Sequence, residues 1–365
     1  MPPLVALLGR KDTPVDGVED YCTFLGRAMA RQGIEVHQVR VRWMEEGWLR
    51  ALRRLWGDAA GWRGSWVLLQ YTALSWSRRG FPLGVLAVLA ALRRRGVRCA
   101  VVFHERSRQG KPSRWLGRIR GACQDWVTRR LYRGAEKAIF VDPLKNIPWL
   151  PKDDAKSAFI PIGANVPERP QKTADFLERN GAARKVAIFC VGGMPYLEEE
   201  LCDISNAARV AVDSGANFRI TFMGRGTREA QGDIARAFQG IPVEVSNLGL
   251  LDADNVSDVL AQSDAMLCVR GRLYPSRGSA IAGIACGLPI LGYAGEAEGT
   301  PLEEAGLMLV PYRDAEALGA ALARVLADPK LAWDLRSKSS EAQRKYFCWD
   351  RIARGFVSAL GTDQL

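Results

Sequence analysis

The chain alternates short apolar runs with stretches of helical periodicity, and it does so twice. In the first half we expect helices at 17–32, 83–95 and 113–132, among strands at 4–8, 34–41, 67–69, 97–103, 137–141 and 158–161. The second half restarts with strands expected at 186–191, 218–223, 243–248, 265–269 and 288–292. Strands separated by helices of this length predict parallel sheets that are wound on both faces.

A chain of 365 residues is too long for one common core, so we expect two α/β domains. The predicted fold is two Rossmann-like, doubly wound domains that face each other across a cleft. The boundaries are placed at 1–165 and 166–345, with a polar linker at 163–185 and a helix at 346–365 that packs back on the first domain. Ligands of such sheets bind at the carboxyl ends of the strands. A kinase or a periplasmic-type binder would show the same pattern.

The composition is that of a globular protein, with 48% hydrophobic and 25% charged residues. The eight cysteines are scattered and form no CxxC pair, which disfavours disulfide and zinc sites and indicates a reducing cytoplasm. No basic leader precedes the first strand, and the longest apolar run, 81–92, is shorter than the ~20 residues that span a bilayer. We therefore expect a soluble cytoplasmic protein, or one attached peripherally to the inner face of the cytoplasmic membrane.

The charge is concentrated in the first half of the chain. Residues 1–180 hold 32 Lys and Arg against 17 Asp and Glu, a balance of +15, and residues 181–365 hold 19 against 23, a balance of −4. Tryptophan and arginine occur together at 48–56, 115–120 and 126–132. Basic amphipathic helices with tryptophan suit an anionic membrane surface. Helices packed on their own sheet with a solvated arginine edge explain the pattern equally well, and a nucleic-acid binder is a weaker alternative because no recognisable module is present.

A candidate diphosphate site lies at 277–291, where an Arg-Gly-Ser loop leads into a helix of small residues that stops at Gly287. A helix N-terminus, a glycine that permits close approach and a guanidinium group together suit a diphosphate. The alternative is a small-residue helix that serves packing alone, with Arg277 as a solvated loop residue.

Several segments, taken in order, resemble the retaining GT-B glycosyltransferases of family 4, also called group 1. The similar segments are the opening loop and first helix at 17–36, the inter-domain turn at 159–165, the strand and glycine turn at 222–226, the stretches 248–250, 259–266 and 285–290, and the closing strand and helix start at 306–318. The resemblance covers most of 1–360. It implies transfer of a sugar, with retention, from a nucleotide-diphosphate sugar to a glycan, lipid-linked or other acceptor.

The resemblance also implies site residues. His104, at the end of a first-domain strand, is expected to contact the transferred sugar, although packing would also explain a histidine there, and His37 is expected to be structural. Arg277 is the second catalytic candidate. Donor-binding candidates are Gly17, Gly193, Arg225, Ser276, Gly278 and Ser279, and acceptor-binding candidates are Gln70, Tyr71, Glu105 and Arg106.

The sequence departs from the family in its charged residues. Family members usually carry two glutamates eight positions apart across the donor loop, where this chain has Tyr274 and Ala282. The usual Arg and Lys after the second domain's first strand are missing, and 191–200 is acidic instead. We expect Arg277 to replace the lost cation, as in a subset of the family with an Arg-Gly-Ser loop, and Arg225 to be the second candidate. The alternative is a catalytically inactive scaffold or subunit of the same fold.

The sequence gives no sign of a metal or of a cofactor beyond the nucleotide-sugar substrate. It contains no His/Asp/Glu cluster with metal-ligand spacing, no Asp-x-Asp pair in a family-like place and no Walker or GxGxxG loop. We therefore expect metal-independent transfer. The expected partners are the donor, a glycan or lipid-linked acceptor and an anionic membrane surface, without nucleic acid.

Overall fold

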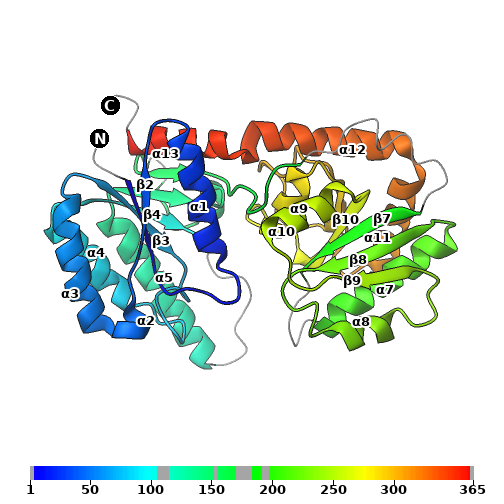
Figure 1. Ribbon diagram of the computed structural model, residues 1–365, viewed down its shortest axis with the longest axis horizontal. Coiled ribbons are helices and arrows are strands. Elements are labelled where there is room, and N and C mark those ends of the chain that lie inside the picture. Colours follow the sequence, from blue (N-terminus) through cyan, green and yellow to red (C-terminus); the bar gives the residue numbers. More distant parts are fainter. Residues whose placement is uncertain (1–3, 105–114, 152–153, 170–182, 191–196, 362–365) are drawn as a thin grey trace. The chain divides into compact units, whose positions relative to one another are not determined.

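The structure is a computed structural model, and it describes residues 4–104, 115–151, 154–169, 183–190 and 197–361 (Figure 1). The chain divides into two units, Met1–Ile162 with Trp349–Leu365, and Gly163–Cys348. Among the described residues, each unit holds a six-stranded sheet in which all neighbouring strands are parallel. The predicted α/β class with doubly wound sheets is confirmed.

The first unit is built on a sheet whose strands follow the order β2-β1-β3-β4-β5-β6. Alternate residues of its strands face opposite sides, so that Leu7 packs into one apolar core and Leu8 into another. Because helices cover both faces, the inner strands are apolar along their length. The strands are β1 (Leu4–Leu8), β2 (Val36–Arg40), β3 (Trp66–Tyr71), β4 (Arg98–Phe103), β5 (Lys137–Phe140) and β6 (Ser157–Phe159).

Two helices from opposite ends of the chain cover one face of this sheet (Figure 1). They are α1 (Gly17–Ala30) and α13 (Trp349–Leu360), which includes most of the C-terminal helix expected at 346–365. Trp349 contacts Tyr21 edge-on and stacks on Phe24, with ring centroids 5.2 and 5.7 Å apart. Asp16 caps the N-terminus of α1, and its carboxylate accepts the backbone N–H groups of Val18 and Glu19 at 3.1 Å.

The opposite face is covered by α3 (Trp48–Asp58), α4 (Gly84–Arg94) and α5 (Trp115–Gly134), with the short α2 (Trp43–Glu46) beside them. The tryptophans of α3 are used in packing. Trp48 stacks on Trp43 at 5.1 Å, and the Trp56 ring lies under the Arg95 guanidinium at 4.1 Å. Since Leu49 and Trp56 of α3 are also exposed, the packed and the membrane-facing interpretations of this helix both stay predictions.

The second unit has the strand order β12-β11-β10-β7-β8-β9. Its strands are β7 (Arg184–Phe189), β8 (Phe218–Met223), β9 (Glu244–Asn247), β10 (Ala265–Arg272), β11 (Ile290–Tyr293) and β12 (Leu307–Val310). One face packs against α7 (Leu197–Asp213), α8 (Gln231–Ala237) and α11 (Ala315–Ala327). The remaining helices are α9 (Ala253–Ala261), α10 (Gly278–Ala285) and α12 (Pro329–Ala342), of which α10 contacts both of the others.

The small residues of α10 also have a packing role. A Cβ atom at Gly283 would lie 2.6 Å from the Ile290 side chain and 2.8 Å from the Met266 sulfur, so this helix lies close on the sheet. The predicted linker is held at its start, because the Ser257 hydroxyl donates to the Pro167 carbonyl and Arg169 pairs with two aspartates of α9. The interior of α10 therefore serves packing, as the alternative interpretation of this segment predicted. The N-terminus of α10 is not used in this packing.

Candidate active site

In the first unit, the carboxyl ends of β3 and β4 bring Gln70 and His104 together. The His104 ring nitrogen Nε2 lies 2.7 Å from the Gln70 carbonyl oxygen Oε1. The amide nitrogen of Gln70 donates to the Leu68 carbonyl at 3.2 Å, which turns Oε1 toward the ring. Because an amide oxygen only accepts, the His104 Nε2 carries the proton and Nδ1 is the acceptor.

Burial lowers the pKa of His104 to about 4, against the opposing effect of the Asp16 charge. The Tyr21 ring packs edge-on against the imidazole with centroids 4.9 Å apart. The histidine is therefore neutral at pH 7. A neutral imidazole whose Nε2 is already committed can accept a hydrogen bond from a sugar hydroxyl at Nδ1.

The other predicted residues of the first unit have different placements. Tyr71 does not line the rim with Gln70, because adjacent strand residues face opposite sides of a sheet. Its ring is 2% exposed and packs against Phe103 in the apolar core, which corrects the expected acceptor role. Gly17 is exposed and is the first residue of α1. Glu105 and Arg106 lie outside the described residues.

In the second unit, Arg277 lies at the N-terminus of α10, where it is the capping residue. Its guanidinium donates to the Arg270 carbonyl and lies over the Tyr274 ring at 4.6 Å. In the first turn of the helix, the Ser279 side chain hydrogen-bonds the Cys268 thiol, while Gly278 is exposed and Ser276 half-buried. The predicted loop thus places a fixed guanidinium beside a helix N-terminus.

The charges of three arginines affect the Cys190 thiol, which lies at the carboxyl ends of β7, β8 and β10. Burial raises the pKa of the Cys190 thiol, and the charges of Arg270, Arg225 and Arg277 oppose that effect, as does a hydrogen bond from the Arg225 backbone N–H. Gly224 adopts φ 103° beside this thiol, and a Cβ atom there would lie 2.7 Å from the sulfur. The arrangement concentrates positive charge where an open α/β sheet binds its ligand.

The comparisons with known proteins identify this unit. Residues 185–328 match the family model described as glycosyl transferases group 1. The second unit is a group 1 glycosyltransferase domain. No curated protein matches the chain in sequence.

Solved structures show that the whole chain has the GT-B fold. Sucrose-phosphate synthase from Thermosynechococcus elongatus is 18% identical, with 99% of each chain covered and a TM-score of 0.70. Anabaena HepE in complex with UDP and glucose is 11% identical, with 99% of this chain and 100% of that chain covered and a TM-score of 0.71. A putative UDP-N-acetylglucosamine 2-epimerase from Listeria monocytogenes is 14% identical, with 99% and 96% covered and a TM-score of 0.63. Since a putative epimerase shares the fold, the family match to residues 185–328, and not the fold, indicates a glycosyltransferase.

Arg270 of this glycosyltransferase was not predicted as a site residue. The sequence signal was an arginine at the end of the strand that precedes the donor loop. Its Nε lies 3.9 Å from an oxygen of the buried Glu200, and Arg313 pairs with Glu199 at 2.9 Å. The acidic first turn of α7, which raised doubt about a cationic site, is therefore balanced by arginines from other loops. Gly193 lies outside the described residues.

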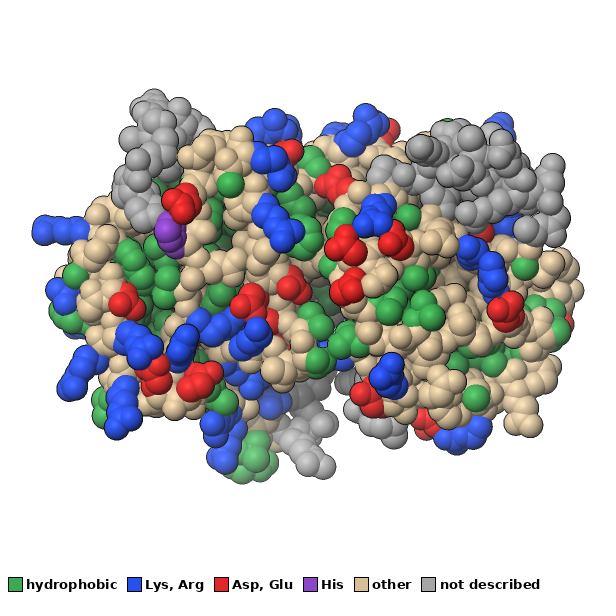
Figure 2. Space-filling view, viewed as in Figure 1, with side chains coloured by type: hydrophobic (Ala, Val, Ile, Leu, Met, Phe, Trp, Pro, Cys, Tyr) green, Lys and Arg blue, Asp and Glu red, His purple; other side chains and the backbone are tan. Residues whose placement is uncertain are grey.

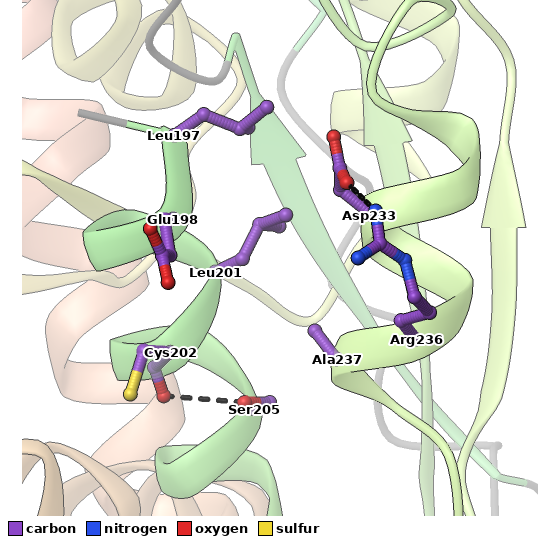
Figure 3. Close-up of a pocket in the computed structure, with 8 residues that line it drawn as sticks. All are labelled: Leu197, Glu198, Leu201, Cys202, Ser205, Asp233, Arg236 and Ala237. Atoms are coloured by element: carbon purple, nitrogen blue, oxygen red, sulfur yellow. Dashed lines mark hydrogen bonds and ion pairs between the residues drawn. The ribbon is translucent and has the colours of Figure 1, made fainter. Parts of the chain in front are cut away.

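A cavity of about 500 Å³ in the glycosyltransferase lies between α7 and α8 (Figure 3). Leu197 and Leu201 point across it toward α8, where Asp233 and Arg236 form an ion pair. No predicted site residue lines this cavity, so it is distinct from the arginine cluster at α10. Within the described ranges, no group of three or more His, Cys, Asp or Glu side chains could hold a metal ion.

Proposed function

We propose that this glycosyltransferase transfers a sugar from a nucleotide-diphosphate donor whose diphosphate lies against Arg277, Arg270 and Arg225. The observation that supports the proposal is the position of Arg277 at the N-terminus of α10, with its guanidinium on the Arg270 carbonyl, while Arg225 follows β8 at the carboxyl edge of the same sheet. Backbone N–H groups of a helix N-terminus and guanidinium groups are the two protein elements that bind phosphate most readily.

The chemistry that this site would perform is stabilisation of the leaving group. When the sugar–oxygen bond breaks, negative charge develops on the terminal phosphate of the donor. Guanidinium groups fixed before the reaction stabilise that charge without reorganisation, and one such group can contribute ~10²-fold or more to the rate. Retention of configuration is proposed on the family resemblance alone.

We place the transferred sugar at the first unit's site. The neutral His104 would accept a hydrogen bond from a sugar hydroxyl at Nδ1, while Gln70 holds the ring in that tautomer. Gly17 and its neighbours at the start of α1 would position the donor. The acceptor, a glycan or a lipid-linked sugar, would bind to the basic first unit.

A thermal-shift screen of nucleoside diphosphates, followed by product-release assays with matching nucleotide sugars, tests the proposal. Because a ligand that binds only the folded state raises its stability, at least one nucleoside diphosphate should raise the melting temperature. UDP is the first to try, since HepE was solved with UDP. An increase that is equal in wild type and Arg277→Ala would contradict the placement of the diphosphate. Binding without any release of nucleotide would instead identify an inactive scaffold.

A further inference from the structure

Helix α5 is apolar on two opposite sides. Gly121, Val127 and Leu131 are buried in the core of the first unit. Trp115, Ile119 and Trp126 point the other way and are 68%, 50% and 47% exposed. At 3.6 residues per turn these three lie within about 40° of one another around the helix. A helix packed on a sheet is ordinarily polar on its outward side, so this stripe needs another explanation.

The loop after β3 lies against the other side of α5, where Arg120 and Gln124 are placed by the 3.6-residue period. Gln124 donates to the Gly80 carbonyl at 3.0 Å, and a Cβ atom at Gly80 would lie 2.7 Å from the Arg120 side chain, so this loop lies against α5. We call the outward surface of α5 the α5 face, and it consists of Trp115, Ile119 and Trp126 with the neighbouring Leu116, which is also exposed.

The surroundings of the α5 face are basic. Helix α5 carries one acidic residue, Asp125, and five exposed arginines at 118, 120, 129, 130 and 133. The Arg130 guanidinium lies over the Trp126 ring at 5.3 Å. Lys and Arg side chains gather along the lower edge of the first unit, with hydrophobic side chains among them (Figure 2). The combination is apolar at its centre and positive around it.

The α5 face begins at the edge of the sheet that carries Gln70 and His104. A helix that connects parallel strands runs against them, so the N-terminal end of α5 lies at their carboxyl ends. The loop after β3 starts from the same edge. A surface bound here would therefore present its head groups close to the sugar side of the first unit's site.

We propose that the α5 face docks on an anionic phospholipid surface. Tryptophan and isoleucine side chains enter the interface between head groups and acyl chains, while arginines bind the phosphates. A second copy of this chain fits poorly, because pairing the face with itself would bring two sets of five arginines together. The link to a lipid-linked acceptor rests on the function proposed above, but membrane binding itself can be tested without donor or acceptor.

The test is co-sedimentation of the full chain with vesicles of phosphatidylcholine alone and of phosphatidylcholine mixed with phosphatidylglycerol. Wild type should bind the mixed vesicles preferentially. Trp115→Ser/Ile119→Ser/Trp126→Ser should lower the partition coefficient roughly tenfold or more, since three apolar side chains lose their burial. Changing Arg118, Arg129, Arg130 and Arg133 to Gln should lower it by about fivefold per arginine on mixed vesicles only.

The matched control is Arg50→Gln/Arg53→Gln/Arg54→Gln on α3, which removes three exposed arginines from another helix of the same unit, whose Trp48 stacks on Trp43. It should retain most of the binding. The single variant Trp115→Ser, at the most exposed tryptophan of α5, keeps the test possible if the triple variant does not fold. Equal binding to both vesicle types, or an equal loss in the α3 control, would overturn the proposal. Binding to duplex DNA without vesicle binding would overturn it too. The vesicle experiments do not test the donor site, because that site is tested separately by nucleotide binding.

Discussion

The sheet edges of the two units carry opposite kinds of site. In the second unit, Arg225 after β8, Arg270 near the end of β10 and Arg277 before α10 raise the local positive charge around Cys190. In the first unit, His104 is held neutral by burial and is committed to an uncharged amide. The difference separates two tasks of sugar transfer, because the leaving diphosphate needs charge and a sugar needs directional hydrogen bonds. If this division is correct, substitutions at the two edges should change different measured quantities.

The largest effect is expected for Arg277→Ala. Turnover should fall by ~10²-fold or more with the fold intact, because the variant lacks a cation that faces the developing phosphate charge. Steady-state release of the nucleoside diphosphate measures the loss, and circular dichroism measures the fold. Near-wild-type turnover would move this role to Arg225 or Arg270.

A smaller loss, about tenfold, is expected for Arg270→Ala. Glu200 already balances part of the Arg270 charge at 3.9 Å, so less of it is available to a ligand. Arg270→Lys should recover part of the turnover, since the charge remains. If Arg270→Ala abolished expression or folding while Arg270→Lys behaved as wild type, the residue would be serving the Glu200 pair alone.

His104→Ala should lower turnover by roughly tenfold and leave nucleotide affinity unchanged, because we place it on the sugar side, where a hydrogen bond is worth ~1 kcal/mol or somewhat more. Isothermal titration with the nucleoside diphosphate gives the affinity. A parallel loss of affinity and turnover would show that the two edges do not divide the work in this way.

The smallest effect concerns stability against pH. The folded pKa of His104, about 4, lies below its ordinary value of 6.5, so the unfolded chain binds more protons between these values. The contribution of neutral His104 to stability is therefore complete above pH 6.5 and decreases as the pH falls toward 4. Relative to His104→Gln, wild type should lose melting temperature across this window. Parallel curves for the two proteins would indicate a histidine with an ordinary pKa.

Much of this organisation was predictable from sequence. The strands and the donor loop follow from apolar periodicity and from the Arg-Gly-Ser segment. The misplacement of Tyr71 was avoidable, because Gln70 and Tyr71 are adjacent in a strand and cannot both face the same side. The role of Arg270 was not predictable, since a charged residue at a strand end does not reveal which thiol or carboxylate lies beside it.

Helices α3 and α5 show a second limit of sequence analysis. Both combine tryptophan with arginine. Which tryptophans are buried depends on neighbours distant in sequence, such as Trp43 and Arg95 for α3. Only the structure shows that Trp48 of α3 stacks on Trp43, while Trp115 of α5 is 68% exposed.

The most direct test of the central claim compares nucleoside diphosphate with nucleoside monophosphate binding, for wild type and Arg277→Ala. The two ligands differ only in the phosphate that we place against the arginine cluster. Wild type should bind the diphosphate at least tenfold more tightly, since a charge-assisted hydrogen bond contributes roughly 1.5–3 kcal/mol, and the ratio should fall in the variant to the smaller value that Arg270 and Arg225 maintain. An unchanged ratio in Arg277→Ala would contradict the account.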